Sequence, residues 1–126
     1  MIIEPEINKW YNAIVKLDMR KIKDCILSGV DVNCVFGKVP FANVANDIPT
    51  GRTITNNNTA LLELCSYTTI KRDLYKKSLL VVKLIVKKYG ADVNLCSLDG
   101  IHPLYRAALN RRRDIVVFLV ENGANI

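Results

Sequence analysis

The chain has 126 residues, room for about one domain, and its hydrophobic content of 50% and charged content of 24% are ordinary for a globular protein. These values argue against disorder along the whole chain. The apolar runs 79–82 and 115–120 fall far short of the roughly 18 residues that indicate a membrane span, so we expect no membrane partner. The first residues lack a basic segment ahead of a long apolar stretch, and no secretory signal is expected.

Residues 5–33 are expected to form a first helix pair. Two short amphipathic segments, 10–15 and 19–27, precede Gly29, the residue type that most often ends a helix in a left-handed conformation. Polar side chains give this pair an outer side suited to water, as a terminal unit of a stack requires.

Residues 34–58 are expected to form a long irregular loop. Glycines, prolines and three consecutive asparagines predict irregular backbone. Apolar residues, among them Phe36 and Phe41, make the segment too hydrophobic for a solvated linker. Two interpretations remain open: a packed loop that covers a seam between helix pairs, or a loop that contacts a partner.

Residues 57–94 and 98–126 are expected to form two further helix pairs. In the first of these two pairs, the segment 66–77 is longer than a short turn between helices, so that roughly ten residues are inserted there. We predict that this insertion extends the first helix of the pair or forms a basic loop.

A short turn sequence recurs along the chain. GADVN at 90–94 returns as GANI at 123–126, with the glycines 33 residues apart, and GVDVN at 29–33 precedes both. A period of about 20 to 50 residues is typical of stacked helix pairs rather than of one globular core. Such arrays usually present a surface to partners and contain no catalytic pocket.

Residues 98–125 resemble a nearly complete ankyrin repeat, whose usual pattern contains D-G-x-T-P-L-H-x-A-A and ends in G-A-D-V-N. Pro103 fits the first helical turn, Ala107 and Ala108 are small where helices pack closely, and Gly123 fits the helix end. The resemblance implies an all-α solenoid of about three helix pairs with two insertions. It also implies a non-catalytic protein–protein interaction module that needs no cofactor. The insertions and the Lys/Asn/Ile-rich composition resemble, more weakly, ankyrin proteins of large DNA viruses or intracellular bacteria, which would imply a host protein as partner.

The resemblance also implies where a partner would bind. Ankyrin proteins usually use a concave side made of turns and first helices. The slots that face outward there are Asn12, Val15, Glu63, Ser66, Arg106 and Leu109. From the loop and the basic turn we add Phe36, Phe41 and Arg112 as binding residues.

Net charge is the remaining signal, because Lys and Arg exceed Asp and Glu by 18 to 12. The two basic clusters are Lys71, Arg72, Lys76 and Lys77, and Arg106, Arg111, Arg112 and Arg113. We expect both clusters on first helices or the turns after them, so that they form one basic side and favour a partner with an acidic segment. An evenly solvated surface is the simpler interpretation. A nucleic-acid-binding module is the alternative function, disfavoured because few aromatic residues accompany the basic ones.

Catalytic chemistry is poorly supported. His102 occupies the slot of the family's helix-starting threonine, and we expect its side chain to cap its own helix, with Tyr105 facing the neighbouring pair. No metal ligand set or phosphate-binding loop is present in the sequence. Leu17 and Arg111 replace the family's turn glycine, and a left-handed backbone there would cost on the order of 1 kcal/mol each.

The four cysteines, at positions 25, 34, 65 and 96, are widely spaced and contain no C-x-x-C pair. We expect four free thiols, two of them in the core, and a cytoplasmic or nuclear location. The last helix pair has no polar cap, so part of the apolar surface of Leu109, Ile115, Phe118 and Leu119 is expected to be exposed. That surface would be covered by a further repeat or by end-to-end self-association.

Overall fold

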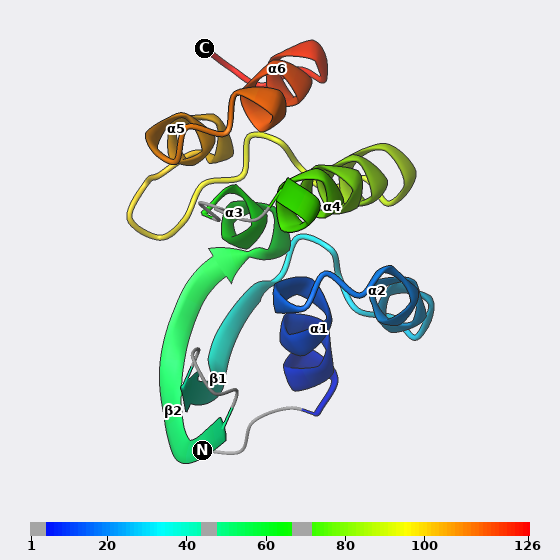
Figure 1. Ribbon diagram of the computed structural model, residues 1–126, viewed down its shortest axis with the longest axis vertical. Helices are drawn as coiled ribbons and strands as arrows, with labels where there is room; N and C mark the ends of the chain where they lie inside the picture. Colours follow the sequence, from blue (N-terminus) through cyan, green and yellow to red (C-terminus); the bar gives the residue numbers. More distant parts are fainter. Residues whose placement is uncertain (1–4, 44–47, 67–71) are drawn as a thin grey trace.

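The computed structural model describes residues 5–43, 48–66 and 72–126, and the side chains of 6–37, 55–66 and 74–126. Helix pairs stack in chain order, with a β-hairpin between the first two (Figure 1). First helices α1, α3 and α5 contact one another in succession, and α4 contacts α6, so the helices form two rows. The elements are α1 (Pro5–Val15), α2 (Met19–Leu27), β1 (Val35–Asn43), β2 (Ile48–Thr59), α3 (Ala60–Cys65), α4 (Arg72–Lys83), the π-helical turn η1 (Leu84–Lys88), α5 (Pro103–Leu109) and α6 (Arg113–Glu121).

The core lies between the two rows and follows the helical period. Trp10 and Ile14 on α1 are four residues apart, as are Ile115 and Leu119 on α6, and all four are fully buried. This spacing places both members of each pair on one face, so every helix contributes one apolar stripe to a continuous core.

The expectation of an all-α fold is corrected by the segment between the first two helix pairs. Instead of an irregular loop over 34–58, β1 and β2 pair antiparallel. Gly37, with φ of 71°, sits at a register shift in which the strand bulges. Pro40 pairs with Thr53 in a sheet of two strands, where its missing N–H is tolerated at an edge. The breakers that predicted irregular backbone are therefore accommodated inside a hairpin.

The base of the hairpin is packed against the first helices. Phe36 is 2% exposed, and its ring lies edge-on to that of Tyr11 on α1, with centroids 5.0 Å apart. On the other strand, the Nδ2 atoms of Asn56 and Asn58 donate to Oε2 of Glu63 on α3, at 3.2 and 2.9 Å. The packed interpretation is therefore correct for the base, and the side chain of Phe41 lies outside the described residues.

The second insertion lengthens the second helix of its pair rather than the first. α3 ends at Cys65, whereas α4 and η1 run without interruption over 72–88, and residues 67–71 lie outside the described part. Apolar residues at helical spacing continue from Leu74 to Ile85, and no glycine interrupts the segment from 72 to 89. The prediction of an extended first helix is therefore wrong.

The three recurrent turns are joined in series by side-chain hydrogen bonds. Oδ1 of Asn33 accepts from the backbone N–H of Asp92 at 2.8 Å, and Oδ1 of Asn94 accepts from that of Asn125, also at 2.8 Å. Within the turns, the carboxylates of Asp31 and Asp92 accept from the N–H two residues on, each at 2.9 Å. We call this series the asparagine ladder, because it fixes each turn on the next.

The glycine of each recurrent turn ends a second helix in the left-handed region, with φ of 110° at Gly29, 73° at Gly90 and 95° at Gly123, which confirms the prediction for Gly123. Leu17 and Arg111 adopt φ of 54° and 57° without being glycine, which confirms the expected strain. Leu17 is 3% exposed and packs in the core, whereas the side chain of Arg111 is exposed.

Arg111→Gly should therefore stabilise the fold by about 0.5 kcal/mol, because relief of left-handed strain exceeds the added freedom of the unfolded chain. The control Leu17→Gly relieves the same strain but removes a buried side chain, and should cost about 3 kcal/mol. Urea unfolding of both variants measures the difference. Equal destabilisation by the two changes would contradict the assignment of strain to Arg111.

Candidate functional site

The six slots that the resemblance places on the concave side are all at least partly accessible. Asn12 on α1 is exposed and Leu109 at the end of α5 is 62% exposed. The other four, Val15, Glu63, Ser66 and Arg106, are intermediate in exposure. We call these six residues the first-helix surface.

Polar contacts hold this surface in place across the boundary between the second and third pairs. Nη1 of Arg106 on α5 donates to Oγ of Ser66, just after α3, at 3.1 Å. Nδ2 of Asn110 donates to the backbone carbonyl of Cys65 at 3.1 Å and so satisfies a carbonyl at the end of α3. The same side chain bonds the carbonyl of Arg106 at 2.8 Å. The surface is therefore preorganised without a partner.

Tyr105 lies beside the first-helix surface, and the sequence analysis did not predict its exposure. Rather than facing the neighbouring pair, its side chain is 58% exposed on α5, one turn from Leu109. The two lie four residues apart and therefore on one helical face. The prediction was wrong because Tyr105 stands where the family's pattern has a histidine that faces the neighbouring repeat. The i, i+4 spacing of Tyr105 and Leu109 on a short helix does indicate that the two side chains share one face.

Glu63 faces the hairpin rather than open solvent. Its carboxylate holds Asn56 and Asn58, as described above, and lies near Tyr11. Burial, followed by the negative charge of Glu63, raises the pKa of the Tyr11 hydroxyl, against a hydrogen bond with Asn56 that lowers it. Glu63 is thus largely committed to anchoring β2.

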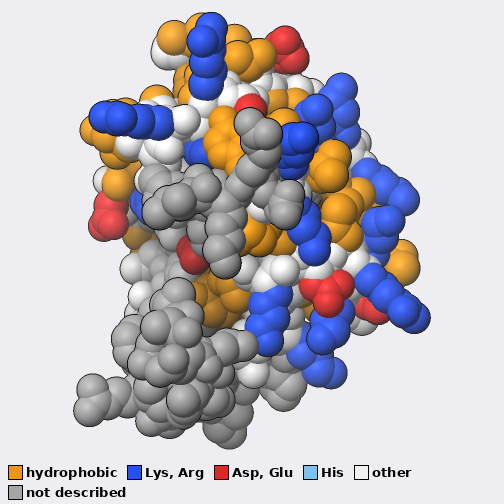
Figure 2. Space-filling model, in the orientation of Figure 1, with side chains coloured by type: hydrophobic (Ala, Val, Ile, Leu, Met, Phe, Trp, Pro, Cys, Tyr) orange, Lys and Arg blue, Asp and Glu red, His pale blue; other side chains and the backbone are white. Residues whose placement is uncertain are grey.

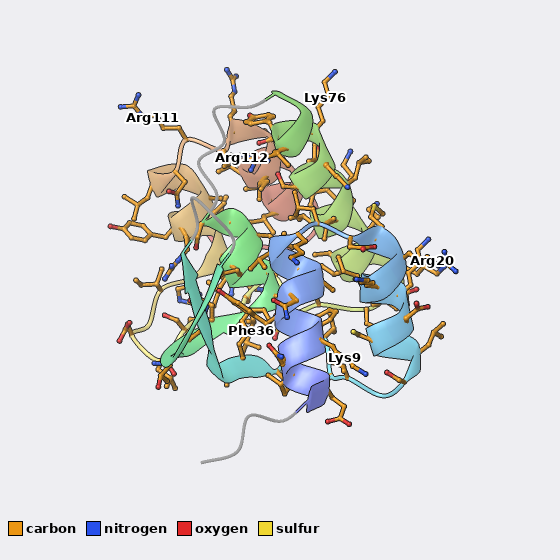
Figure 3. All side chains as sticks on the ribbon, turned by 60° about the horizontal axis from the view of Figure 1, so that its bottom comes forward. Lys9, Arg20, Phe36, Lys76, Arg111 and Arg112 are labelled. Carbon is orange, nitrogen blue, oxygen red and sulfur yellow. The ribbon has the colours of Figure 1, made fainter. Side chains whose placement is uncertain are left out.

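Arg112 is not a surface residue, and its assignment to the binding face is corrected. It is 1% exposed, its Nε and Nη2 donate to the Asp114 carboxylate at 3.2 and 3.1 Å, and Nη2 also bonds the Tyr75 carbonyl at 3.0 Å. The guanidinium lies 4.2 Å from the Tyr75 ring centroid. Figure 3 shows Arg112 among the helices and Arg111 pointing outward. Arg112 therefore joins α4 to α6.

The ion pair perturbs the titration of its acidic partner. Partial burial acts to raise the pKa of Asp114, but the hydrogen bonds and positive charge of Arg112, with further bonds from the Tyr75 hydroxyl and the Ile115 N–H, outweigh it. The pKa of Asp114 consequently lies below its ordinary value of 3.8.

The basic residues do not form one concave side. Lys76 and Lys77 lie on α4, a second helix, together with exposed Lys83, Lys87 and Lys88 further along α4 and η1. Figure 2 shows blue side chains gathered along the right side, over α4 and α2. The prediction failed because the insertion was assigned to a first helix. Arg106 is the predicted basic residue that the first-helix surface retains.

His102 is at the N-terminal cap of α5 but makes no capping hydrogen bond with its side chain, which corrects that expectation. Thr59, in the corresponding position, accepts from the N–H of Leu62 at 3.3 Å. An imidazole is longer than a threonine side chain, and its exposed ring extends into solvent.

Other titratable groups in the described part of the chain offer little chemistry. No group of three His, Cys, Asp or Glu side chains there is placed to hold a metal ion. Cys25 and Cys65 are buried, as predicted for two core thiols, and all four cysteines are free. Burial, only partly offset by the charges of Arg112 and Arg106, raises the pKa of Cys65 to about 12, so it is protonated at neutral pH.

The apolar surface of the last pair differs from the expected one. Ile115, Phe118 and Leu119 are 0 to 5% exposed because they pack against the preceding pair and α5. Leu109 is exposed as predicted, and Val117 and Val120 are 48% and 41% exposed on α6. The expected patch is therefore made of other residues.

These features define the class of the fold: a stack of helix pairs whose outer surface is held in place by hydrogen bonds between neighbouring pairs. A family model described as ankyrin repeats (many copies) matches residues 74–125, so this part of the chain is similar to ankyrin repeats. The family is typically a non-enzymatic scaffold that mediates protein–protein interaction. No curated protein matches the chain. In the described residues, no helix has the length and apolar character to cross a membrane.

Arg112→Met should lower the free energy of unfolding by about 3 kcal/mol, because it leaves Asp114 without its partner between α4 and α6. Arg112→Lys should also destabilise, since an ammonium cannot replace the bidentate bonds and the stacking. The neighbouring Arg113→Met is the control and should change stability by less than about 0.5 kcal/mol. Urea unfolding measures all three.

The ion pair between Arg112 and Asp114 also makes the free energy of unfolding depend on pH. Since the folded pKa of Asp114 is lowered, its stabilisation is present above about pH 4 and is lost as the pH falls through the folded pKa. The stability gap between the wild type and Asp114→Asn should shrink from pH 7 to pH 3. A gap that is constant over this range would contradict the ion-pair account.

Proposed function

We propose that the chain is a non-catalytic protein-recognition module that binds its partner on the first-helix surface, widened by Tyr105 and by the hairpin that borders it. We extend the repeat assignment to the pairs before residue 74, because they carry the same turn and the same ladder bond. The proposed location is the cytoplasm or the nucleus, where free thiols stay reduced.

One observation carries the choice of surface: Tyr105 and Leu109 are 58% and 62% exposed beside Arg106 on α5. Tyrosine and arginine are the residue types that most often dominate binding energy at protein interfaces. Arg106 is already held by Ser66, so little side-chain freedom is lost on binding. An aromatic and an aliphatic side chain around a fixed guanidinium suit a protein partner.

The test places a photoreactive phenylalanine analogue at Leu109 in the full chain expressed in cells. The control carries it at Leu27, which is 79% exposed on α2 in the other row. We expect a discrete protein adduct at position 109 and none at position 27. For the partner so identified, Tyr105→Ala should weaken binding at least tenfold, about 1.4 kcal/mol, without lowering the melting temperature.

Equal labelling at the two positions, or adducts that vanish after nuclease treatment, would contradict the proposal. The second outcome would favour nucleic-acid binding, which the exposed lysines on α4 and η1 support as the alternative. Binding of that kind would weaken steeply with salt for any duplex sequence.

A further inference from the structure

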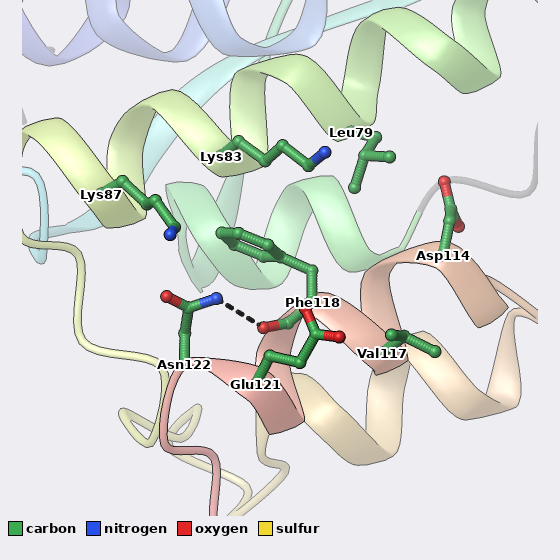
Figure 4. Close-up of a pocket in the computed structure, with 8 residues that line it drawn as sticks. All are labelled: Leu79, Lys83, Lys87, Asp114, Val117, Phe118, Glu121 and Asn122. Carbon is green, nitrogen blue, oxygen red and sulfur yellow. Dashed lines mark hydrogen bonds between the residues drawn. The ribbon is translucent and has the colours of Figure 1, made fainter.

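A groove of about 490 Å³ runs between the second helices of the last two pairs, and none of its lining residues belongs to the first-helix surface. One wall is α4 with η1, which contributes Leu79, Lys83 and Lys87. The other wall is α6, with Val117, Phe118 and Glu121 among its lining residues. Figure 4 shows the lysines extending from the first wall, with the Phe118 ring between the two walls.

The groove combines an apolar floor with unequal charge on its walls. Val117 is 48% exposed and Leu79 is half-buried, so apolar surface is open to a ligand. Lys83 and Lys87 are exposed, and none of the ion pairs found among the described side chains joins them to Glu121. On α6, Asp114 is already paired with Arg112. The uncompensated charge of the groove is therefore positive and lies along the α4–η1 wall.

The spacing of the lining residues indicates the shape of the occupant. Leu79, Lys83 and Lys87 follow one another at four-residue intervals, a straight stripe of on the order of 12 Å at about 1.5 Å per residue. A groove between two helices that presents such stripes suits a helix of two to three turns, read through its i, i+4 and i+7 positions. η1 also places Lys87 in a π-helical turn, a feature frequent at functional sites.

We propose that this groove binds an acidic amphipathic helix of a partner protein. Its apolar side chains would cover Leu79, Val117 and the edge of Phe118, while its carboxylates would pair with Lys83 and Lys87. This site lies on second helices and is independent of the first-helix surface, so either can exist without the other.

The experiment selects binders of the full chain from a display library of random 16-residue peptides. We expect enriched peptides to combine Asp or Glu with Leu, Ile or Phe at helical spacing. The strongest of them is then synthesised with a fluorophore and titrated at 0.15 M salt. Lys87→Glu should weaken it at least fivefold, Val117→Asp similarly, and Glu121→Gln should strengthen it about twofold because a repulsive charge is removed.

Lys76→Glu is the matched control. It makes the same charge change on α4 at a position that does not line the groove, eleven residues from Lys87, or on the order of 16 Å along the helix. This is about twice the Debye length of roughly 8 Å at 0.15 M salt, so its effect should stay below twofold. A peptide in which the acidic residues are replaced by Lys should lose binding to the wild type and regain it with Lys87→Glu.

Several results would overturn the proposal. These are a selection without enriched peptides, enrichment without acidic residues, and equal effects of Lys76→Glu and Lys87→Glu. Competition by an arbitrary duplex DNA with the same affinity as the peptide would assign the lysines to nucleic acid instead. Loss of concentration-dependent sedimentation in Val117→Asp would assign the groove to a second copy of the chain.

Discussion

The asparagine ladder is the constraint on which the stack depends. Asn33 and Asp92 are 59 residues apart in sequence, and Asn94 and Asn125 are 31 apart, yet both bonds measure 2.8 Å. The hairpin and the lengthened second helix both lie between the partners of the first bond. Because the ladder bonds fix each turn relative to the next, the two long insertions between the turns do not change the spacing of the helix pairs.

The polar interactions between the helices give the two rows of helices surfaces of different chemistry. The guanidinium of Arg112 is buried, where its hydrogen bond to Tyr75 joins α4 to α6. The guanidinium of Arg106 donates a hydrogen bond to Ser66 in the row of first helices. The solvated lysines are left mainly on α4 and η1. The first-helix surface is consequently apolar and aromatic around Leu109 and Tyr105, whereas the groove on the other row is basic. The two surfaces suit partners of different chemistry.

Local patterns in the sequence predicted the features that depend on local chemistry. The turn glycines and the strained Leu17 and Arg111 follow from spacing and backbone preference. Apart from the missing cap at His102, the errors concern long-range packing. The burial of Arg112 depends on Tyr75, 37 residues away, and no periodicity reports such a contact. The hairpin was missed because Gly37 and Pro40 were interpreted as breakers, although a bulge and a sheet edge accept both.

Hydrogen exchange on Asn94→Ala tests the ladder most directly. The substitution removes the acceptor of the Asn125 N–H, so the third pair should loosen from the second. The account predicts faster exchange of the amides in α5 and α6 and of Asn125, with α1 and α2 unchanged. The control Asn57→Ala, an exposed residue of β2, should leave α5 and α6 unaffected. If Asn94→Ala leaves α5 and α6 as protected as in the wild type, or accelerates exchange equally in every helix, the ladder does not hold the repeats together.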